Sequence, residues 1–503
     1  RLSEAADRAI EEGAIQTARL FMDRAVARIE EDRQEIDDLE DLLRRKRIAD
    51  AAIYARRADA AALAFAFRAA AADYARAHEL VEKWDDELAS QSRSSQAEAL
   101  LRHGEATGER AALDEALAAY EAILRALPPG ERGADWAIAR NNMALVLHVL
   151  GERSGGAELA QAKAMFEEVM AVFARLGDDV NWSAAQNNVG NVLLTLGTRE
   201  ADSERIEEAA AAFRAALTRR DRETRPAEWA ASQNNIGLAT FLLGDRRGEA
   251  ALLEEAEAAY RAALEVFTRA SHPVDWGMTQ NNLGNVLNAL GVLRNDITYH
   301  DRAVAAFEDA LTVRTKEAWP EPWATTRLNL GNAYFFRARH NQGLEDLEKA
   351  REAYDDALAL FSREEAPLDW ASAQSNLGSV LQTIGQRNQD LATLELSVSA
   401  FNEALKVYRR RDFPLDWAGS QHNLGGTLHM MGVISGEPRH HRDAIAAYRQ
   451  ALREHTRERL PMLWANSTAG IGTALQSLAS SDPTTVSLRR SVEARRAALE
   501  VLT

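Results

Sequence analysis

The chain has 503 residues, more than one compact core usually holds, so its length suggests several domains or an array of repeats. Hydrophobic residues make up 46%, and alanine, leucine, glutamate and arginine dominate, which is typical of a soluble, helix-rich protein. The net charge of −17 opposes the binding of nucleic-acid phosphates and anionic membrane surfaces, and no window approaches the roughly 18 consecutive apolar residues of a membrane span. We therefore expect neither nucleic acid nor membrane as a partner.

The chain contains no cysteine, which excludes disulfides, thiolate metal sites and cysteine nucleophiles. A cysteine-free composition fits a reducing compartment, so the predicted localisation is cytoplasmic. The first residue is Arg1, and the opening stretch carries no signal-peptide pattern. These features are compatible with a longer protein in which another domain precedes this chain.

Residues 1–90 are predicted to form an irregular helical region with degenerate repeat units. Two sets of small and larger residues, at Gly13–Ala18–Met22–Ala25 and at Ala70–Tyr74–Ala77, have a spacing that recurs more fully later. Between them, residues 30–47 read "EEDRQEIDDLEDLLRRKR". The mixed charges favour an exposed, salt-bridged helix over a nucleic-acid or targeting patch at Leu42–Arg47. Residues 91–133 form one further degenerate unit, marked by Gly104, Ala116, Tyr120 and Ile123.

From residue 134 to residue 503 the chain repeats itself eight times. Successive tryptophans are separated by 46 residues once and then by 47 residues six times; they are Trp136, Trp182, Trp229, Trp276, Trp323, Trp370, Trp417 and Trp464. From the third copy onward a proline precedes each tryptophan by three residues. A fixed period in this range indicates a solenoid of stacked structural units.

Each repeat is predicted to contain two helices. The proline and the acidic residue after it, as in "PVDW", suit the start of the first helix. A glycine fifteen residues after the tryptophan is predicted to end that helix, at Gly197, Gly244, Gly291, Gly385 and Gly432. A polar connector such as "GTREADSE" follows, and then an alanine-rich amphipathic helix such as residues 253–267 or 299–314.

The internal spacing identifies a family. Leu283 and Gly284 are followed by Ala303, Phe307 and Ala310, and equivalent sets recur in phase along the chain. This pattern resembles the tetratricopeptide repeat, and its "NNLG" core is similar to the subclass found in kinesin light chains and in many bacterial repeat proteins. The resemblance covers roughly residues 90–503 and implies an all-α, right-handed α-solenoid of helix-turn-helix repeats.

The repeats are longer than the standard unit of about 34 residues, and the surplus is predicted to fall in the connector and in a longer second helix. A HEAT-type array shares the length but does not explain the leucine-glycine and alanine-aromatic-alanine spacing. The last unit is predicted to act as a cap, because Ser491, Arg495 and Ala498 replace the usual alanine-aromatic-alanine set.

By resemblance, residues two, five, six, nine and twelve positions after each tryptophan face the concave groove of the superhelix. Many of them are amides. The predicted partner-binding residues are Asn188, Asn191, Asn234, Asn235, Asn281, Asn282, Asn285, Asn288, Asn329, Asn332, Phe335, Asn376 and Asn423. One interpretation is that the amides bind the backbone of an extended peptide, since an amide offers both a donor and an acceptor. The other is that each asparagine ties its helix to the adjacent repeat.

No motif indicates catalysis or a cofactor: GxSxG, P-loop and HExxH patterns are absent. His422 and His429 lie seven residues apart, with His440 and His441 following, but polar groove residues and a solvated loop explain them better than a metal site. The predicted function is a non-catalytic scaffold that binds a protein or an extended peptide. By resemblance it is the regulatory or sensor part of a larger bacterial signalling or defence system, with a fused or associated effector domain. The alternatives are a self-assembling array and a small-ligand sensor.

Overall fold

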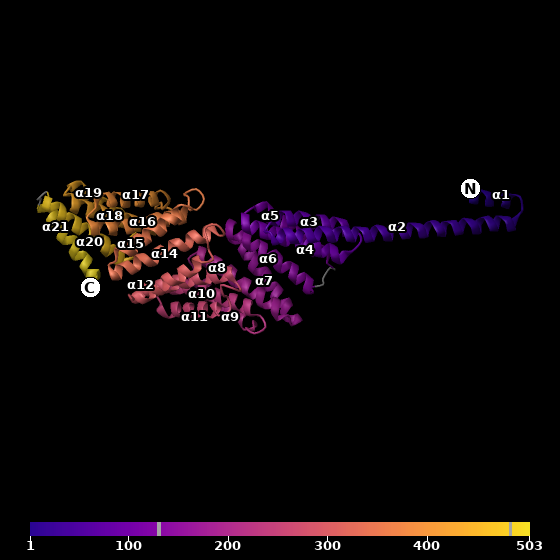
Figure 1. Ribbon diagram of the computed structural model, residues 1–503, viewed down its shortest axis with the longest axis horizontal. Helices are drawn as coiled ribbons and strands as arrows, with labels where there is room; N and C mark the ends of the chain where they lie inside the picture. Colours follow the sequence, from indigo (N-terminus) through magenta and orange to yellow (C-terminus); the bar gives the residue numbers. More distant parts are fainter. Residues whose placement is uncertain (128–131, 482–484, 503) are drawn as a thin grey trace. The chain divides into compact units, whose positions relative to one another are not determined.

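The computed structural model describes residues 1–127, 132–481 and 485–502, and every regular element in those ranges is an α-helix. This confirms the prediction of an all-α solenoid (Figure 1). The chain divides into two units, Arg1–Arg219 and Arg220–Thr503. The boundaries predicted near residues 90 and 133 stay a prediction. In the described ranges no helix is both long enough and apolar enough to cross a membrane.

The first unit holds nine helices within its described residues. They are α1 (Leu2–Glu11), α2 (Ile15–Leu63), α3 (Phe67–Val81), α4 (Asp86–Thr107), α5 (Arg110–Ala126), α6 (Ala134–Ser154), α7 (Gly156–Leu176), α8 (Asp179–Arg199) and α9 (Ser203–Leu217). Each helix packs against the next one in the chain.

The second unit holds twelve helices within its described residues, again with each packed on its successor. They are α10 (Pro226–Arg247), α11 (Ala250–Leu264), α12 (Pro273–Arg294), α13 (Ile297–Leu311), α14 (Pro320–Asn341), α15 (Leu344–Leu358), α16 (Pro367–Asn388), α17 (Leu391–Val407), α18 (Pro414–Ser435), α19 (Pro438–Ala451), α20 (Pro461–Ser481) and α21 (Thr485–Leu502).

Each tryptophan-marked repeat is one pair of helices, from α6–α7 to α20–α21. The predicted role of proline is confirmed, because the first helix of every repeat from α10 to α20 begins at a proline. At that position the missing amide hydrogen is no loss and the fixed φ suits a helix. The tryptophans of neighbouring repeats, such as Trp323 and Trp370, pack into one apolar cluster beside Ala357 and Phe361.

Close contact between glycine and an aromatic ring holds the two helices of a repeat together. A Cβ added at Gly284 of α12 would lie 2.6 Å from Cε1 of Phe307 on α13, and Gly331 has the same relation to Tyr354 at 2.6 Å. Both rings are fully buried. The leucine-glycine and alanine-aromatic-alanine spacing is therefore the pattern of a helix that must approach its partner closely over a large ring.

The prediction that glycines end the first helices was wrong. Helix α12 continues three residues past Gly291 and ends where Asn295 adopts the left-handed conformation, with φ 52°. Gly291 lies inside the helix, and the position requires glycine because a Cβ there would be 2.6 Å from the buried His300 ring. Glycine at this position serves close packing and leaves the helix end to the residue with positive φ.

The predicted location of the extra length was also wrong. Helix α12 has 22 residues and α13 has 15, so the first helix is the longer one. Only residues 295–296 connect them, and residues 312–319 form the loop to the next repeat. The residues predicted to begin each polar connector form the last turn of the first helix instead. The charged residues of this turn keep it in contact with solvent.

The N-terminal region is dominated by one continuous helix, α2, of 49 residues. The charged stretch at residues 30–47 is helical and exposed, as predicted. Helix α1 folds back along the beginning of α2, with Gly13 in the turn, and α3 packs on its end, where Ala51 and Ala77 are buried. In Figure 1 the middle of α2 is a single rod between these two contacts.

The degenerate unit predicted at residues 91–133 and the atypical last repeat both use repeat-like packing. Tyr120 of α5 is buried, in the place of the aromatic residue of a full repeat. In the last repeat, Arg495 is exposed and its aliphatic stem lies over Gly472, while Ser491 Oγ donates a hydrogen bond of 2.8 Å to the Gly472 carbonyl. Val492 and Leu499 on the same helix are 66% and 57% exposed, so the outer face of α21 carries apolar as well as polar residues, and its role as a cap stays a prediction.

Candidate partner-binding surface

The first helices of the repeats form the inner side of the second unit. Each of them contacts the first helix of the next repeat as well as its own second helix, along the series α10, α12, α14, α16, α18 and α20. Among the described residues the second helices of successive repeats approach one another less closely. In a curved stack the helices that lie closer together line the concave side. The predicted amide residues of this unit all lie on these first helices.

Several amides bond one repeat to the next. Asn329 Nδ2 donates to Asn281 Oδ1 at 3.2 Å, and Asn376 Nδ2 donates to Asn332 Oδ1 at 3.0 Å. Thr279 Oγ1 lies 3.3 Å from Asn234 Oδ1, which it can reach as a donor. These bonds satisfy polar groups between packed helices, where an unpaired amide would destabilise the fold.

The amides also differ in burial. Asn234 and Asn281 are only 5% and 6% exposed, so little of either side chain can touch a partner. The other predicted amides are half-buried: Asn188 and Asn191 on α8 of the first unit, and Asn235, Asn282, Asn285, Asn288, Asn329, Asn332, Asn376 and Asn423 in the second.

A hollow of about 420 Å³ lies on the first helices of three consecutive repeats, α10, α12 and α14. Two predicted residues, Asn285 and Asn288, line it beside the aromatic rings of Phe241 and Phe336. Val292 and Leu293 add apolar surface at its edge, where they are 51% and 43% exposed. Apolar walls with a few fixed amides are the usual makeup of a site that binds an apolar side chain and orients its polar neighbours.

His300, which the sequence analysis did not single out, fixes one of these amides. It lies on α13, is 1% exposed, and its Nδ1 donates to Asn288 Oδ1 at 2.8 Å. Its ring stacks on Phe336 with centroids 5.7 Å apart. Burial, reinforced by the nearby His340, lowers the pKa of His300 to about 4, so the ring is neutral near pH 7. With its oxygen engaged, Asn288 presents its NH2 group as the free donor.

A sequence signal for His300 exists. Nine residues after the glycine that corresponds to Gly291, other repeats have an aliphatic residue that packs against that glycine, such as Leu253 or Leu394. His300 replaces it in this repeat. A polar residue at a core position in only some copies marks a place where the repeat does something the others do not.

Phe335 lies apart from the hollow. Its ring is half-buried against the core cluster of the second unit and touches Phe336, with centroids 5.9 Å apart. The residue that lines the hollow is Phe336, on the adjacent face of α14.

The arginines near the amide row are engaged by carboxylates. Arg327 on α14 contacts Asp356, and Arg140 in the first unit is 3.1 Å from Glu168. Ion pairs of this kind reduce the attraction of the surface for a free carboxylate.

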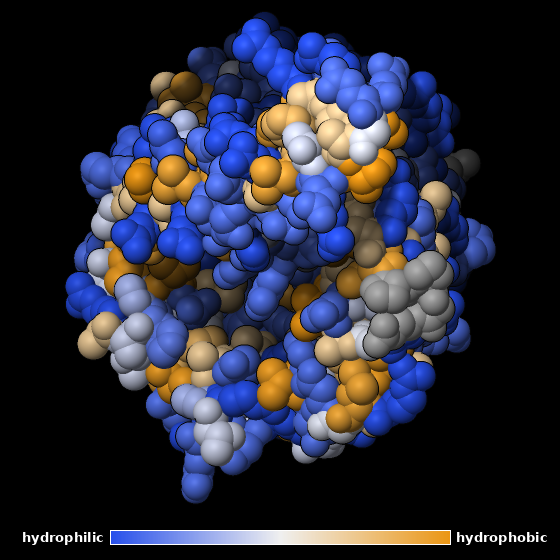
Figure 2. Space-filling view, turned by 90° about the vertical axis from the view of Figure 1, so that its right-hand side faces the viewer, coloured by the Kyte–Doolittle hydropathy of each residue, from blue (hydrophilic) through white to orange (hydrophobic). Residues whose placement is uncertain are grey.

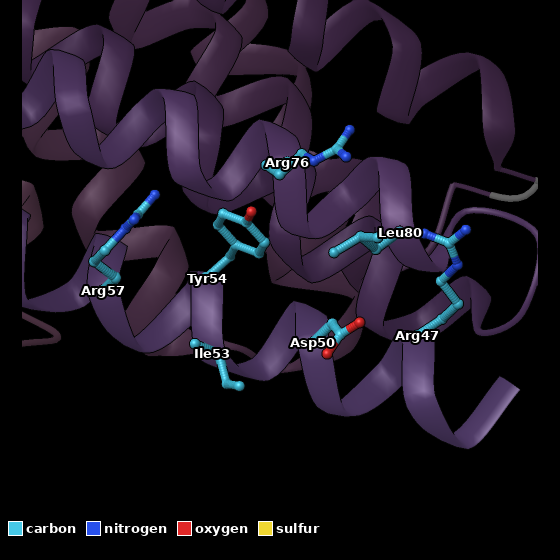
Figure 3. A pocket seen from close by; sticks show the side chains of 7 residues that line it. All are labelled: Arg47, Asp50, Ile53, Tyr54, Arg57, Arg76 and Leu80. Atoms are coloured by element: carbon cyan, nitrogen blue, oxygen red, sulfur yellow. The ribbon is translucent and has the colours of Figure 1, made fainter. Parts of the chain in front are cut away.

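A second hollow, of about 450 Å³, lies between α2 and α3 and is lined by Arg47, Asp50, Ile53, Tyr54, Arg57, Arg76 and Leu80 (Figure 3). Two of its three arginines are ion-paired, Arg57 with Asp73 at 2.6 Å between Nε and Oδ2, and Arg76 with Glu79 at 2.5 Å. Its cationic lining is therefore largely neutralised within the fold.

On the face shown in Figure 2, hydrophobic residues form small patches separated by hydrophilic surface.

The histidines near the C-terminus make hydrogen bonds within the fold. His422 Nδ1 and Ser467 Oγ are 2.9 Å apart, and His429 Nδ1 is 3.2 Å from His441 Nδ1. Burial, with His455 nearby, lowers the pKa of His422 to about 4. Within the described parts of the chain, no group of three or more histidine, aspartate or glutamate side chains is arranged to hold a metal ion.

The fold and this surface define the chain as a helical-repeat protein with an amide-lined inner face. No family model matches it, and no curated protein matches it.

Solved structures with some similarity include BtubC from P. vanneervenii, with 17% identity over 50% of this chain and 94% of that one and a TM-score of 0.35. A Rap protein complexed with competence and sporulation factor is 12% identical over 79% of this chain and 100% of that one, with a TM-score of 0.41. The quorum sensor NprR from B. thuringiensis is 14% identical over 79% and 99%, with a TM-score of 0.44. Likeness at this level assigns no function to the chain.

Proposed function

We propose that the chain is an interaction scaffold whose inner face binds an extended segment of a partner protein, centred on the hollow of α10, α12 and α14. An apolar side chain of the segment fills the space between Phe241 and Phe336. Asn285 and Asn288 bond the backbone on either side of it. We further propose that the scaffold is the regulatory or sensor part of a bacterial signalling or defence system with a fused or associated effector domain, on the resemblance of its repeats to such arrays.

The observation that carries the proposal is the pairing of His300 with Asn288. A buried neutral histidine that replaces the usual aliphatic residue holds an amide oxygen at 2.8 Å, so that amide is oriented before any ligand arrives. Groups held in place in advance lose less entropy on binding. The neighbouring aromatic and aliphatic side chains supply the apolar contact that anchors such segments.

The test is selection of peptides from a random display library on the full chain, followed by affinity measurement of the best binder. The variant Asn285→Ala/Leu293→Glu removes one amide and places a charge at the edge of the hollow. Leu344→Glu is the matched control, because Leu344 is 45% exposed and lies outside the hollow, while Leu293 is 43% exposed. All three proteins are first compared by circular dichroism and melting temperature.

We expect the double variant to bind the selected peptide at least about tenfold more weakly, which corresponds to about 1.4 kcal/mol, while the control binds like the parent. Equal binding by all three proteins would place the site elsewhere and overturn the proposal. A library that yields no binder, while small metabolites shift the melting temperature, would favour the alternative of a small-ligand sensor.

A further inference from the structure

Helix α2 has a middle segment that no other described part of the chain covers. Residues 26–47 are all exposed, between the part that α1 covers and the part that α3 covers. Ion pairs and hydrogen bonds one turn apart support it, such as Arg28 with Asp32 at 3.2 Å and Arg45 with Asp41 at 3.4 Å. A helix held only by such pairs would be expected to have a polar surface all round.

The exposed surface of α2 instead carries an apolar stripe with a seven-residue period. Ile15, Met22, Ile29, Ile36 and Leu43 recur every seven residues, and each is at least 40% exposed. Three residues after each of them come, in order, Ala18, Ala25, Asp32, Leu39 and Lys46. These are the a and d positions of a coiled coil. The a positions are all apolar and the d positions are apolar except for Asp32 and Lys46, and the pattern predicts a second helix packed along the stripe.

The flanking charges select the partner and its direction. If a second copy of α2 ran antiparallel, with Met22 beside Leu39 of that copy, Arg19 would face Glu40 and Arg28 would face Glu35. By symmetry each of these attractive pairs would form twice. The same alignment places Phe21 opposite Leu42, so the flanking apolar residues also meet.

A parallel, in-register pair would be repulsive at the same positions. Arg28 would then face Arg33 and Glu35 would face Glu40 of the second copy. Asp32 of one copy would also meet Asp32 of the other in the middle of the seam. In the antiparallel register Asp32 meets Ile29 of the other copy, so it is the charges flanking the seam, and not its central layers, that favour the antiparallel direction.

Helix α1 leaves room for this pairing. Ala6 and Ala9 of α1 are buried, as is Ala18 of α2, so α1 covers the side of α2 that carries Ala18. Met22, Val26 and Ile29 on the neighbouring side stay 40%, 53% and 64% exposed. Because Ala18 is itself a d position, α1 closes the seam at that layer, and a second helix can lie along α2 from residue 19 onward while α1 keeps its place.

We propose that the chain forms a homodimer through an antiparallel coiled coil of α2, over residues 19–42, with a second copy of the same chain. This proposal rests on α2 alone and is independent of the function proposed for the inner face of the repeats.

The first test is the mass of the full chain by sedimentation and by light scattering over a range of concentrations. We expect twice the chain mass of 55.5 kDa for the parent. The variant Ile29→Glu/Ile36→Glu should be monomeric with an unchanged circular dichroism spectrum, because both side chains are exposed and make no part of the core. The control Val274→Glu/Leu415→Glu, which changes two comparably exposed residues on α12 and α18, should stay dimeric. A monomeric parent, or a dimer that persists in the α2 variant, would overturn the proposal.

The second test is the direction of the helices. Arg28→Glu should raise the dimer dissociation constant about tenfold in the antiparallel pair, because the introduced carboxylate would face Glu35 twice, and adding Glu35→Arg should restore it. In a parallel pair the single change would tighten the dimer, since the introduced carboxylate would face Arg33.

Crosslinking gives an independent measure of direction, and the absence of cysteine from the chain leaves it without background. Mixed Met22→Cys and Leu39→Cys proteins should form a heterodimeric disulfide that neither forms alone. Tightening by Arg28→Glu, or crosslinking of either protein with itself, would refute the antiparallel arrangement.

Discussion

Replacing Gly284 by alanine separates helix propensity from packing in this fold. Alanine is a better helix former than glycine by about 1 kcal/mol, so on propensity alone the change would stabilise α12. The added Cβ, however, would lie 2.6, 2.7 and 2.8 Å from three carbons of the Phe307 ring, whereas favourable carbon contacts lie near 3.5–4.0 Å. The ring is fully buried, so it has no open space into which to move.

Overpacking of this kind typically destabilises by about 1–3 kcal/mol, so we expect a net loss of about 1–2 kcal/mol for Gly284→Ala after the propensity gain. Gly419 in α18 is the control, because a Cβ there meets nothing within 4 Å. Gly419→Ala should stabilise by up to about 1 kcal/mol. The assays are urea unfolding followed by circular dichroism, and hydrogen exchange of α12 and α13 to localise the effect. If Gly284→Ala were as stable as Gly419→Ala, close helix approach over the ring would not be the reason for the glycine.

Two further changes test buried polar groups. Burial lowers the pKa of His300 to about 4. As the pH falls from about 6.5 to 4, the unfolded chain therefore takes up a proton that the native ring does not, and the free energy of unfolding decreases. His300→Gln should reduce this acid loss by up to about 3 kcal/mol, measured by unfolding at pH 7 and pH 4.5. Asp346 is 6% exposed and accepts hydrogen bonds from Arg337 at 2.6 and 2.9 Å. Asp346→Ala should destabilise the fold by about 2 kcal/mol, less than for a fully isolated ion pair, because Arg337 also contacts Asp301 at 3.2 Å. The control Glu345→Ala, at an exposed position, should change stability by less than about 0.5 kcal/mol.

The repeat architecture could be predicted because it depends on residues that recur in phase. Proline at the helix start and glycine opposite a ring each have one physical reason that every copy repeats, so the period reveals them. The helix ends could not be predicted in the same way. Gly291 looks like a helix terminus, yet it is needed for close approach to His300, and the residue that ends the helix is Asn295, whose positive φ has no unique sequence mark.

The candidate site was predictable only in part, since a site depends on what differs between repeats. The amides at Asn285 and Asn288 were found from their positions after the tryptophan. Their grouping with Val292 and Leu293 depends on the unexpected extra turn of α12 beyond Gly291. The charges at residues 30–47 predicted an exposed helix, but they did not show that the apolar stripe of α2 is left uncovered, because a heptad stripe reads the same whether the fold covers it or not.

The aromatic residue of each second helix helps decide which asparagine is free to bind a partner. Tyr354 donates its hydroxyl to Asn332 at 2.7 Å, so that amide is engaged within the fold. In the repeat of Tyr260 the corresponding position is Leu238, and the buried Tyr260 hydroxyl has no hydrogen-bond partner.

The repeat of Asn285 has the opposite mismatch, because its aromatic residue is Phe307, which has no hydroxyl to engage the amide. This difference supports Asn285, rather than Asn332, as a contact for a partner.

The same reasoning predicts opposite effects of one chemical change at the two tyrosines. Tyr260→Phe removes an unsatisfied buried hydroxyl and should stabilise the fold by about 1 kcal/mol or more. Tyr354→Phe removes a made hydrogen bond and leaves the acceptor of Asn332 with fewer partners, so it should destabilise by about 1 kcal/mol. Urea unfolding of the two variants beside the parent measures both. Equal shifts in the same direction would mean that the hydroxyls do not distinguish the repeats, and the case for Asn285 would lose its support.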